Sequence, residues 1–125
     1  MFESVSDIEL RQQIANIASQ FQIFQCIECA DAINSWMVSN NIRGKQIVLF
    51  TGSTEDPYGN IYHEIIQKNI ATNGVHKGIA VELLGEELIF DNINHQGISR
   101  EAWLNNLYCV IKETGRDFQI TETDF

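Results

Sequence analysis

The sequence predicts a small α+β protein in which N-terminal helices pack on a mostly antiparallel sheet. Two helical patterns come first along the chain, short strand patterns follow, and the regular strand-helix alternation of a parallel sheet is missing. The 125 residues are 44% hydrophobic with one proline, which suffices for a single core. We therefore expect one domain over residues 1–125, with a helical segment (1–22) followed by the core of the fold (23–125).

The first helix is predicted to run from about Ser6 to Gln20. Ser6-Asp7-Ile8-Glu9 has the form of a capping box, in which two side chains bond the first free backbone N–H groups. Val5 and Leu10 have the spacing of a hydrophobic staple across the helix start. Leu10 also begins an apolar series at helical spacing, which continues with Ile14, Ile17 and Phe21.

A second helix is predicted to start at or just before Cys26. Small or apolar residues recur from there at offsets of three and four, namely Cys26, Cys29, Ala30, Ile33 and Met37. The pattern stops at Ser39-Asn40-Asn41, which is typical of a helix end. A thiol is therefore expected in the first turn of this helix.

The middle of the sequence carries strand and turn signals. Gln46–Phe50 is predicted to be a strand that leads into an exposed loop over 52–60. Isoleucines at positions 61, 65, 66 and 70 are spaced as in a short third helix. Gly78–Leu84 and Glu87–Asp91 flank Gly85-Glu86 at the spacing of a β-hairpin.

The C-terminal part is predicted to hold one more helix and one more strand. Ser99 is placed as the cap of a helix that continues through Leu107 to Ile111. Phe118–Thr121 is predicted to be the last strand. Cys109 lies in an apolar run and is expected to be a buried structural residue.

The charge balance excludes several kinds of ligand. The net charge is −9 and the eight basic residues are scattered, so the basic surface that grips a nucleic-acid backbone is missing. The acidic N-terminus lacks the features of a signal peptide, and no run approaches the ~20 apolar residues of a membrane span. We expect no nucleic acid, no membrane insertion and a cytoplasmic location where the chain is made. Three cysteines, an odd number, favour reduced thiols.

Cys26, His76 and Asp91 are the candidate catalytic residues. A thiolate is favoured at a helix N-terminus by unpaired N–H groups and the helix dipole. Cysteine catalysis also needs an imidazole to carry the proton and a third group to orient the imidazole. His76 opens one strand of the predicted hairpin and Asp91 closes the other, so antiparallel pairing would make them neighbours.

This ordered set resembles the papain-fold toxin domains of bacterial polymorphic toxin systems, within the papain-like cysteine peptidase superfamily. The resemblance covers about residues 21–103. It is carried by Cys26-Ile27-Glu28-Cys29-Ala30, the helix through Ile33 and Met37, Gly74-Val75-His76-Lys77-Gly78-Ile79, Phe90-Asp91-Asn92-Ile93, Gly97-Ile98 and Trp103. It implies a papain-like fold whose catalytic core is residues 23–125, with nucleophile, base and orienting acid in the order Cys, His, Asp.

The resemblance also implies a chemistry and partners. The chemistry is acyl transfer through a thioester: hydrolysis of a peptide or amide, deamidation, or transglutaminase-like exchange. The substrate is then a protein or peptide, an immunity or inhibitor protein would restrain the enzyme, and a toxin would be delivered into target cells. No cofactor is implied, and Cys26-x-x-Cys29 lacks the second ligand pair of a zinc site.

Two cysteines compete for the role of nucleophile. In compact members of the family small residues stand three and four positions after the cysteine, which fits Cys26 because Cys29 and Ala30 follow it. Cys29 remains the alternative, since Cys29-Ala30 can be aligned with the second cysteine of papain's Cys-x-x-Cys. We favour Cys26, whose thiol has better access to the unpaired N–H groups of the first turn.

An oxyanion hole would combine the backbone N–H of the nucleophile with a side-chain donor. Gln20, Gln22 and Gln25 all lie just upstream of Cys26. Papain-like enzymes place a glutamine there, and the spacing implied by the resemblance favours Gln20 among the three.

Other interpretations stay open at this point. His63 falls in the predicted third helix, where it would be solvated, and His95 falls in a loop, so both are weaker candidates for the base. A thioredoxin-like redox pair at Cys26 and Cys29 is a minor alternative, because the βαβ context is missing. The rival from another functional class is a catalytically silent papain-fold module that binds other proteins.

Overall fold

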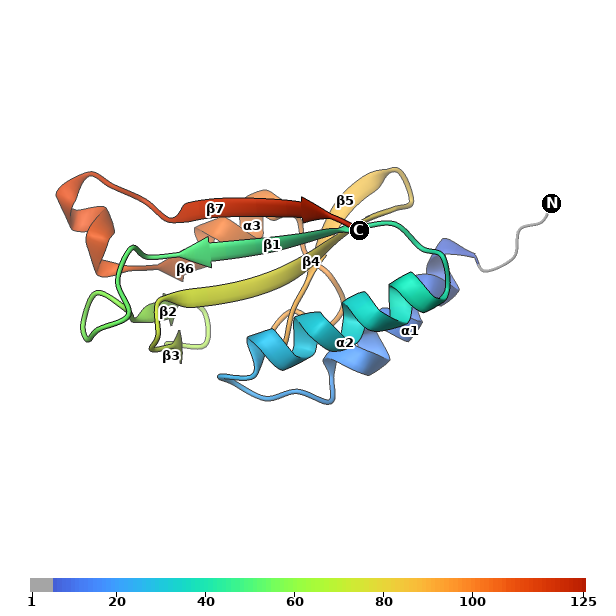
Figure 1. Ribbon diagram of the computed structural model, residues 1–125, viewed down its shortest axis with the longest axis horizontal. Coiled ribbons are helices and arrows are strands. Elements are labelled where there is room, and N and C mark those ends of the chain that lie inside the picture. Colours follow the sequence, from blue (N-terminus) through green and yellow to red (C-terminus); the bar gives the residue numbers. More distant parts are fainter. Residues whose placement is uncertain (1–5) are drawn as a thin grey trace.

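The computed structural model describes residues 6–125 and confirms the predicted α+β fold (Figure 1). The elements in chain order are α1 (Asp7–Ala18), α2 (Cys26–Ser39), β1 (Lys45–Phe50), β2 (Ile61–His63), β3 (Lys68–Ala71), β4 (Val75–Leu83), β5 (Glu86–Phe90), α3 (Arg100–Asn105), β6 (Leu107–Tyr108), the 3-10 helix η1 (Val110–Thr114) and β7 (Gln119–Asp124). The strands form an antiparallel sheet of order β5-β4-β1-β7 and a smaller antiparallel sheet of order β3-β2-β6.

Both N-terminal helices begin where the sequence predicts. The Ser6 side chain accepts from the backbone N–H of Glu9, and the Glu9 side chain bonds back to the Ser6 backbone, so the capping box is confirmed. Val5, the other half of the predicted staple, lies outside the described residues. Helix α2 begins at Cys26, as expected. Of the helices that residues 6–125 form, none has the length and apolar character needed to cross a membrane.

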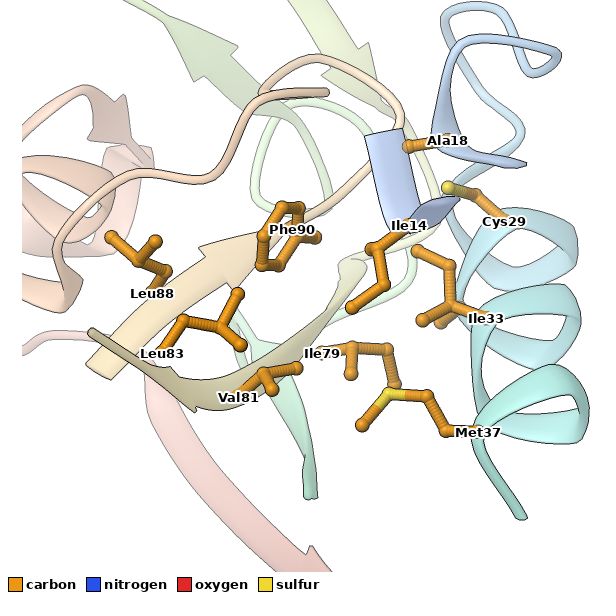
Figure 2. Packing of buried hydrophobic residues seen from close by; sticks show 11 residues of the cluster. Ile14, Ala18, Cys29, Ile33, Met37, Ile79, Val81, Leu83, Leu88 and Phe90 are labelled. Carbon is orange, nitrogen blue, oxygen red and sulfur yellow. The ribbon is translucent and has the colours of Figure 1, made fainter. Parts of the chain in front are cut away.

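The two helices lie side by side against one face of the larger sheet (Figure 1). Figure 2 shows Ile33 and Met37 of α2 directed toward Ile79 on β4, with Ile14 of α1 and Phe90 of β5 in the same cluster. Burial of each such side chain contributes roughly 1.5 to 3 kcal/mol. This packing aligns α2 with β4, and it brings the first residue of α2 to the start of that strand.

A second core lies on the other face of the larger sheet. Because side chains alternate along a strand, Ala80 of β4 and Leu49 of β1 point away from the helices. They pack with Ile61 of β2, Trp103 of α3 and Leu107 of β6, which joins the smaller sheet to the larger one.

The predicted hairpin between β4 and β5 is present, with its turn one residue earlier than expected. Leu83 pairs with Glu86, so the two-residue loop is Leu84-Gly85 rather than Gly85-Glu86. Both loop residues have positive φ, 54° and 82°, as a mirror-image hairpin turn requires. The Leu84 N–H donates to the Asp7 carboxylate (2.8 Å), which ties the turn to the start of α1.

The predicted helix around Ile61–Ile70 is wrong, because these residues form the hairpin of β2 and β3. Ile61 and His63 are buried while Tyr62 between them faces outward, which is the two-residue period of a strand. Ile65 and Ile66 lie in the connecting turn, and Ile65 is 69% exposed. Pairing of β2 with the distant β6 outweighs the local helical spacing.

The helix predicted from Ser99 to Ile111 is shorter than expected. The Ser99 side chain accepts from the backbone N–H of Ala102, so the predicted cap is confirmed, but α3 ends at Asn105. Leu107 and Tyr108 then pair with β2 as β6, and a 3-10 helix follows. The predicted last strand is confirmed, although it extends to Asp124 as the exposed edge strand β7.

Two glycines with positive φ provide a test of the backbone geometry. A Cβ added to Gly74 (φ 84°) would lie 2.1 Å from the Ser53 carbonyl oxygen, whereas one added to Gly85 (φ 82°) would meet nothing within 4 Å. We expect Gly85→Ala to lower the free energy of unfolding by about 1 to 2 kcal/mol, from backbone strain alone. Gly74→Ala should cost at least ~2 kcal/mol more. Urea unfolding of both variants checks this, and equal losses would contradict the described loop.

Candidate active site

Cys26 is the first residue of α2, and its side chain is directed at the start of β4. Cys26 is 4% exposed, and its Sγ lies 3.8 Å from the backbone carbonyl oxygen of Val75. The side-chain oxygen of Gln25, the residue before the helix, accepts from the Gln22 N–H, which shapes the approach to α2. The thiol therefore lies at the positive end of a helix dipole, which favours its ionised form.

His76 follows Val75 on β4, and its ring is completely buried. Its Nε2 lies 2.8 Å from an oxygen of the Asp91 carboxylate, so the structure brings together these two candidates, 15 residues apart in sequence. Its other nitrogen, Nδ1, has no hydrogen-bond partner among residues 6–125. The Cys26 thiol contacts the carbonyl oxygen of Val75, the residue before His76, and the thiol and the imidazole each favour the charged form of the other.

Asp91 directly follows β5 and is held by donors on both carboxylate oxygens. One oxygen bonds His76 and also accepts from the indole N–H of Trp103, at 2.8 Å in each case. The other accepts from the backbone N–H groups of Ile93 (2.9 Å) and Asn94 (2.6 Å) and from the Asn94 side chain (3.1 Å). A buried carboxylate with this many donors stays ionised and fixed in orientation.

Trp103 and Gly78 form the wall behind the imidazole. The ring centres of Trp103 and His76 lie 5.8 Å apart. A Cβ on Gly78 would come within 2.9 Å of the Trp103 ring, so glycine at this position of β4 lets the indole lie against the strand. The sequence interpretation gave Trp103 no chemical role. The sequence feature that could have indicated this role is a tryptophan in the helix that follows the Asp91 loop.

In Cys26, His76 and Asp91, attraction between the charged groups outweighs the effect of burial on the pKa. Burial disfavours a charge on each of them, yet the pKa of Cys26 is lowered because His76 stabilises the thiolate. The pKa of His76 is raised to about 9 by Asp91 and Cys26, in spite of burial. Hydrogen bonds and the charge of His76 hold the pKa of Asp91 at about 2, again against burial. The interactions among the three groups therefore favour the thiolate and the imidazolium over the neutral forms.

The other two cysteines lie in the cores. Cys29 is fully buried between the helices and the sheet, and burial raises its pKa to about 12, helped by the charges of Asp91 and Cys26. Cys109 is fully buried in the second core, as expected, and burial raises its pKa too. Both thiols therefore stay protonated at neutral pH, and their pKa values are shifted in the opposite direction to that of Cys26.

Two of the three glutamines before α2, Gln20 and Gln25, have side chains that are hydrogen-bonded to the backbone. The Gln20 side-chain amide donates to the Asn16 carbonyl of α1 (3.3 Å), and Gln20 is exposed. In this conformation the amide is bonded to α1 and does not serve as the expected oxyanion donor. Asn92, a buried residue that the sequence interpretation missed, donates to the Gln22 carbonyl (2.7 Å). Asn92 thereby ties the loop before Cys26 to the corner that holds Asp91.

Of the two other histidines, His63 lies in a different environment from the one predicted, whereas His95 lies in a loop as predicted. The expectation of a solvated His63 on a helix is wrong, because His63 lies on β2 with 3% exposure and burial lowers its pKa. Its Nδ1 accepts from the N–H groups of Ile65 and Ile66, which leaves the proton on Nε2. His95 lies in a loop, with Nε2 2.8 Å from the Asn92 carbonyl oxygen. Within residues 6–125, no three His, Cys, Asp or Glu side chains are grouped to share a metal ion.

A cysteine at the start of a helix, packed against a strand that carries a histidine hydrogen-bonded to an aspartate, is the arrangement of a papain-like domain. Residues 9–108 match the family described as Papain fold toxin 2, and the chain belongs to that family. No curated protein and no solved structure gives a significant match to the chain.

The indole N–H of Trp103 supports a test of the Asp91 environment. We expect Trp103→Phe to lower the free energy of unfolding by about 1 to 3 kcal/mol through the lost hydrogen bond to a buried carboxylate, in addition to lost packing. Trp36→Phe is the matched control, because Trp36 packs against the first core and its side chain makes no hydrogen bond within residues 6–125. Urea unfolding of both variants measures the difference, and an equal loss would contradict a structural role for the indole N–H.

The lowered pKa of Asp91 predicts a loss of stability in acid. A carboxyl group with pKa about 2 in the folded chain and 3.8 unfolded stabilises the fold above pH 3.8, and this contribution is lost as pH falls through 2. The stability difference between the natural chain and Asp91→Asn should therefore shrink by about 2 kcal/mol between pH 4 and pH 2. A constant difference in denaturant unfolding over this range would contradict the pKa shift.

Proposed function

We propose that this papain-fold toxin domain is a cysteine-dependent acyl-transfer enzyme, a peptidase, amidase or deamidase, with Cys26 as nucleophile. The observation that carries the proposal is the buried His76–Asp91 hydrogen bond, at 2.8 Å, which leaves the second imidazole nitrogen without a partner among residues 6–125. The Cys26 Sγ lies 3.8 Å from the carbonyl oxygen of Val75, the residue before His76. The opposite pKa shifts of Cys26 and Cys29 support Cys26 over the alternative nucleophile.

The proposed reaction begins with attack of the Cys26 thiolate on a carbonyl carbon of a peptide or carboxamide. A C–S bond forms and the carbonyl oxygen takes the negative charge. His76 then gives its Nδ1 proton to the departing nitrogen, the C–N bond breaks, and a thioester remains. In the second half, His76 takes a proton from water as the water attacks the thioester, and the acid leaves while the thiolate returns.

Asp91 is proposed to orient the imidazole and to stabilise its charged form. Because Asp91 engages Nε2, the reactive nitrogen is Nδ1, and the ring cannot turn without breaking a 2.8 Å hydrogen bond. Trp103 and Asn94 act through Asp91 by holding its carboxylate. These are positioning residues, and their substitution should affect proton transfer more than substrate affinity.

The oxyanion in this mechanism is placed at the N-terminus of α2. Backbone N–H groups of the first helical turn are suited to this charge. Gln20 is the proposed side-chain donor, and it would have to leave the Asn16 carbonyl to take that role.

Substrate access requires a rearrangement, because the Cys26 residue is 4% exposed. Phe24, just upstream, is 58% exposed and has a φ of 74°, an unusual conformation for a bulky residue. We propose that the segment 19–25 moves when a polypeptide substrate enters. An immunity or inhibitor protein that binds over this segment would hold the enzyme inactive, and delivery into target cells would release it.

A silent binding module is the second candidate function, and the burial of Cys26 is the observation that favours it. In that case the three groups would only stabilise the fold. The distinction between the two functions lies in the reactivity of the thiol.

Alkylation with iodoacetamide, followed by mass spectrometry, separates the two candidates. For the enzyme we expect Cys26 to react at pH 6 at least ~10-fold faster than Cys29 or Cys109, because its thiolate forms at lower pH. His76→Gln should abolish this selectivity, since an amide can still reach Asp91 but does not titrate. Cys29→Ser is the matched control and should leave the rate at Cys26 unchanged. Uniform slow labelling of the three thiols would reject the enzyme in favour of the silent module.

The same groups set the pH dependence of turnover once a substrate is found. The thiolate is present above the lowered pKa of Cys26, and the imidazolium is lost as pH rises through about 9. We expect kcat/KM to fall above pH 9 in the natural chain. The fall should begin at lower pH in Asp91→Asn, because the group that raises the pKa of His76 is gone. A profile that is unchanged in Asp91→Asn would contradict the role given to Asp91.

A further inference from the structure

The outer face of the smaller sheet carries a hollow that the proposed reaction does not use. The hollow has a volume of about 410 Å³ and is lined by Asn60, Tyr62, Glu64, Asn69, Tyr108 and Val110. Along β2 and the residues that flank it, positions 60, 62 and 64 alternate with the buried Ile61 and His63, so the lining side chains point away from the second core. The sheet therefore has one face in the core and another that is open to a ligand.

Two tyrosines form the centre of the hollow. Tyr62 of β2 and Tyr108 of β6 are direct partners in the antiparallel register, which places their side chains next to each other on one face. The Tyr108 hydroxyl donates to the Glu113 carboxylate, and this bond raises its pKa to about 12. The phenol therefore stays protonated, and a carboxylate lies beside it. Aromatic faces next to carboxylates attract cations.

The polar atoms around the tyrosines include acceptors that could receive a cationic donor. Of the lining residues, all within the described range 6–125, Glu64 alone is charged, and it is exposed. The Asn60 amide nitrogen donates to Asp56 (2.8 Å), so the Asn60 amide oxygen is the atom free to receive a donor. Asn69 stands opposite Tyr62 on β3 and adds a second amide.

We propose that this hollow binds the side chain of an arginine presented by a partner polypeptide. A guanidinium is planar and stacks on a phenol ring, and its five N–H groups match the Glu64 carboxylate and the amide oxygens. An anion would meet the Glu64 carboxylate, and a purely apolar side chain would leave that carboxylate and the amides without partners. The net charge of −9 further favours a basic partner.

This site is independent of the reaction proposed for Cys26. The lining residues lie on the opposite face of the smaller sheet from His63 and Leu107. Binding of the cation can therefore be measured in a Cys26→Ser variant, and loss of one function leaves the other testable.

Nuclear magnetic resonance titration of the 15N-labelled Cys26→Ser chain tests the proposal. The probe is Nα-acetyl-arginine methylamide, and the matched control ligand is Nα-acetyl-citrulline methylamide, which has the same shape without the charge. We expect saturable amide shifts confined to the segments 60–64, 69–70 and 108–110 with the arginine probe. Glu64→Gln should weaken binding about two- to fivefold, whereas Asp31→Asn, which removes an exposed carboxylate on α2, should leave it unchanged.

Two tyrosine variants separate the ring from its hydroxyl. Tyr62→Phe keeps an aromatic face and should bind within twofold of the natural residue, while Tyr62→Leu should lose most of the binding. The dispersion of the amide spectrum reports whether each variant is folded. Equal binding of the citrulline control, shifts spread over the surface, or binding that survives both Glu64→Gln and Tyr62→Leu would overturn the proposal.

Discussion

The buried hydrogen bond between His76 and Asp91 is the interaction on which the rest of the site depends. Burial of two ionisable groups destabilises a fold unless the groups bond each other. Removal of one partner leaves an unpaired buried charge and lowers the free energy of unfolding by about 3 to 5 kcal/mol. Further hydrogen bonds offset this cost: backbone N–H groups of the turn after β5 donate to Asp91, and so does the indole N–H of Trp103. A charged form of either residue without its partner would destabilise the fold, so the pair acts as one structural unit.

The two cores position the parts of the site from opposite faces of the larger sheet. On one face, the apolar stripe of α2 packs along β4, which leaves the first helical residue over the first residues of the strand. On the other face, Trp103 packs over Gly78 and closes the space behind the imidazole. The strand β4 is therefore shared by both halves of the site, because neighbouring residues point to opposite faces. Asn92 adds a direct link between the corner after β5 and the loop before α2.

The parts of this arrangement that could be predicted are those set by local sequence. The capping box at Ser6, the start of α2 at Cys26 and the β4–β5 hairpin follow from neighbouring residues, and the hairpin alone was enough to expect His76 near Asp91. Residues 61–70 could not be assigned locally, since their strand pairing depends on Leu107 and Tyr108 far along the chain. The support given by Trp103 and Asn92 was missed for the same reason. The catalytic roles rest on the family resemblance and on chemistry that a fold alone does not establish.

The position of Trp103 has a practical consequence. Its indole lies 5.8 Å from the His76 ring and shares the same carboxylate oxygen. A protonated imidazole withdraws electron density from an excited indole more strongly than a neutral one, so emission from this tryptophan reports the ionisation of its neighbour. With Trp36 replaced, the emission of Trp103 alone would follow the protonation of His76, and this signal can be measured in solution without any substrate.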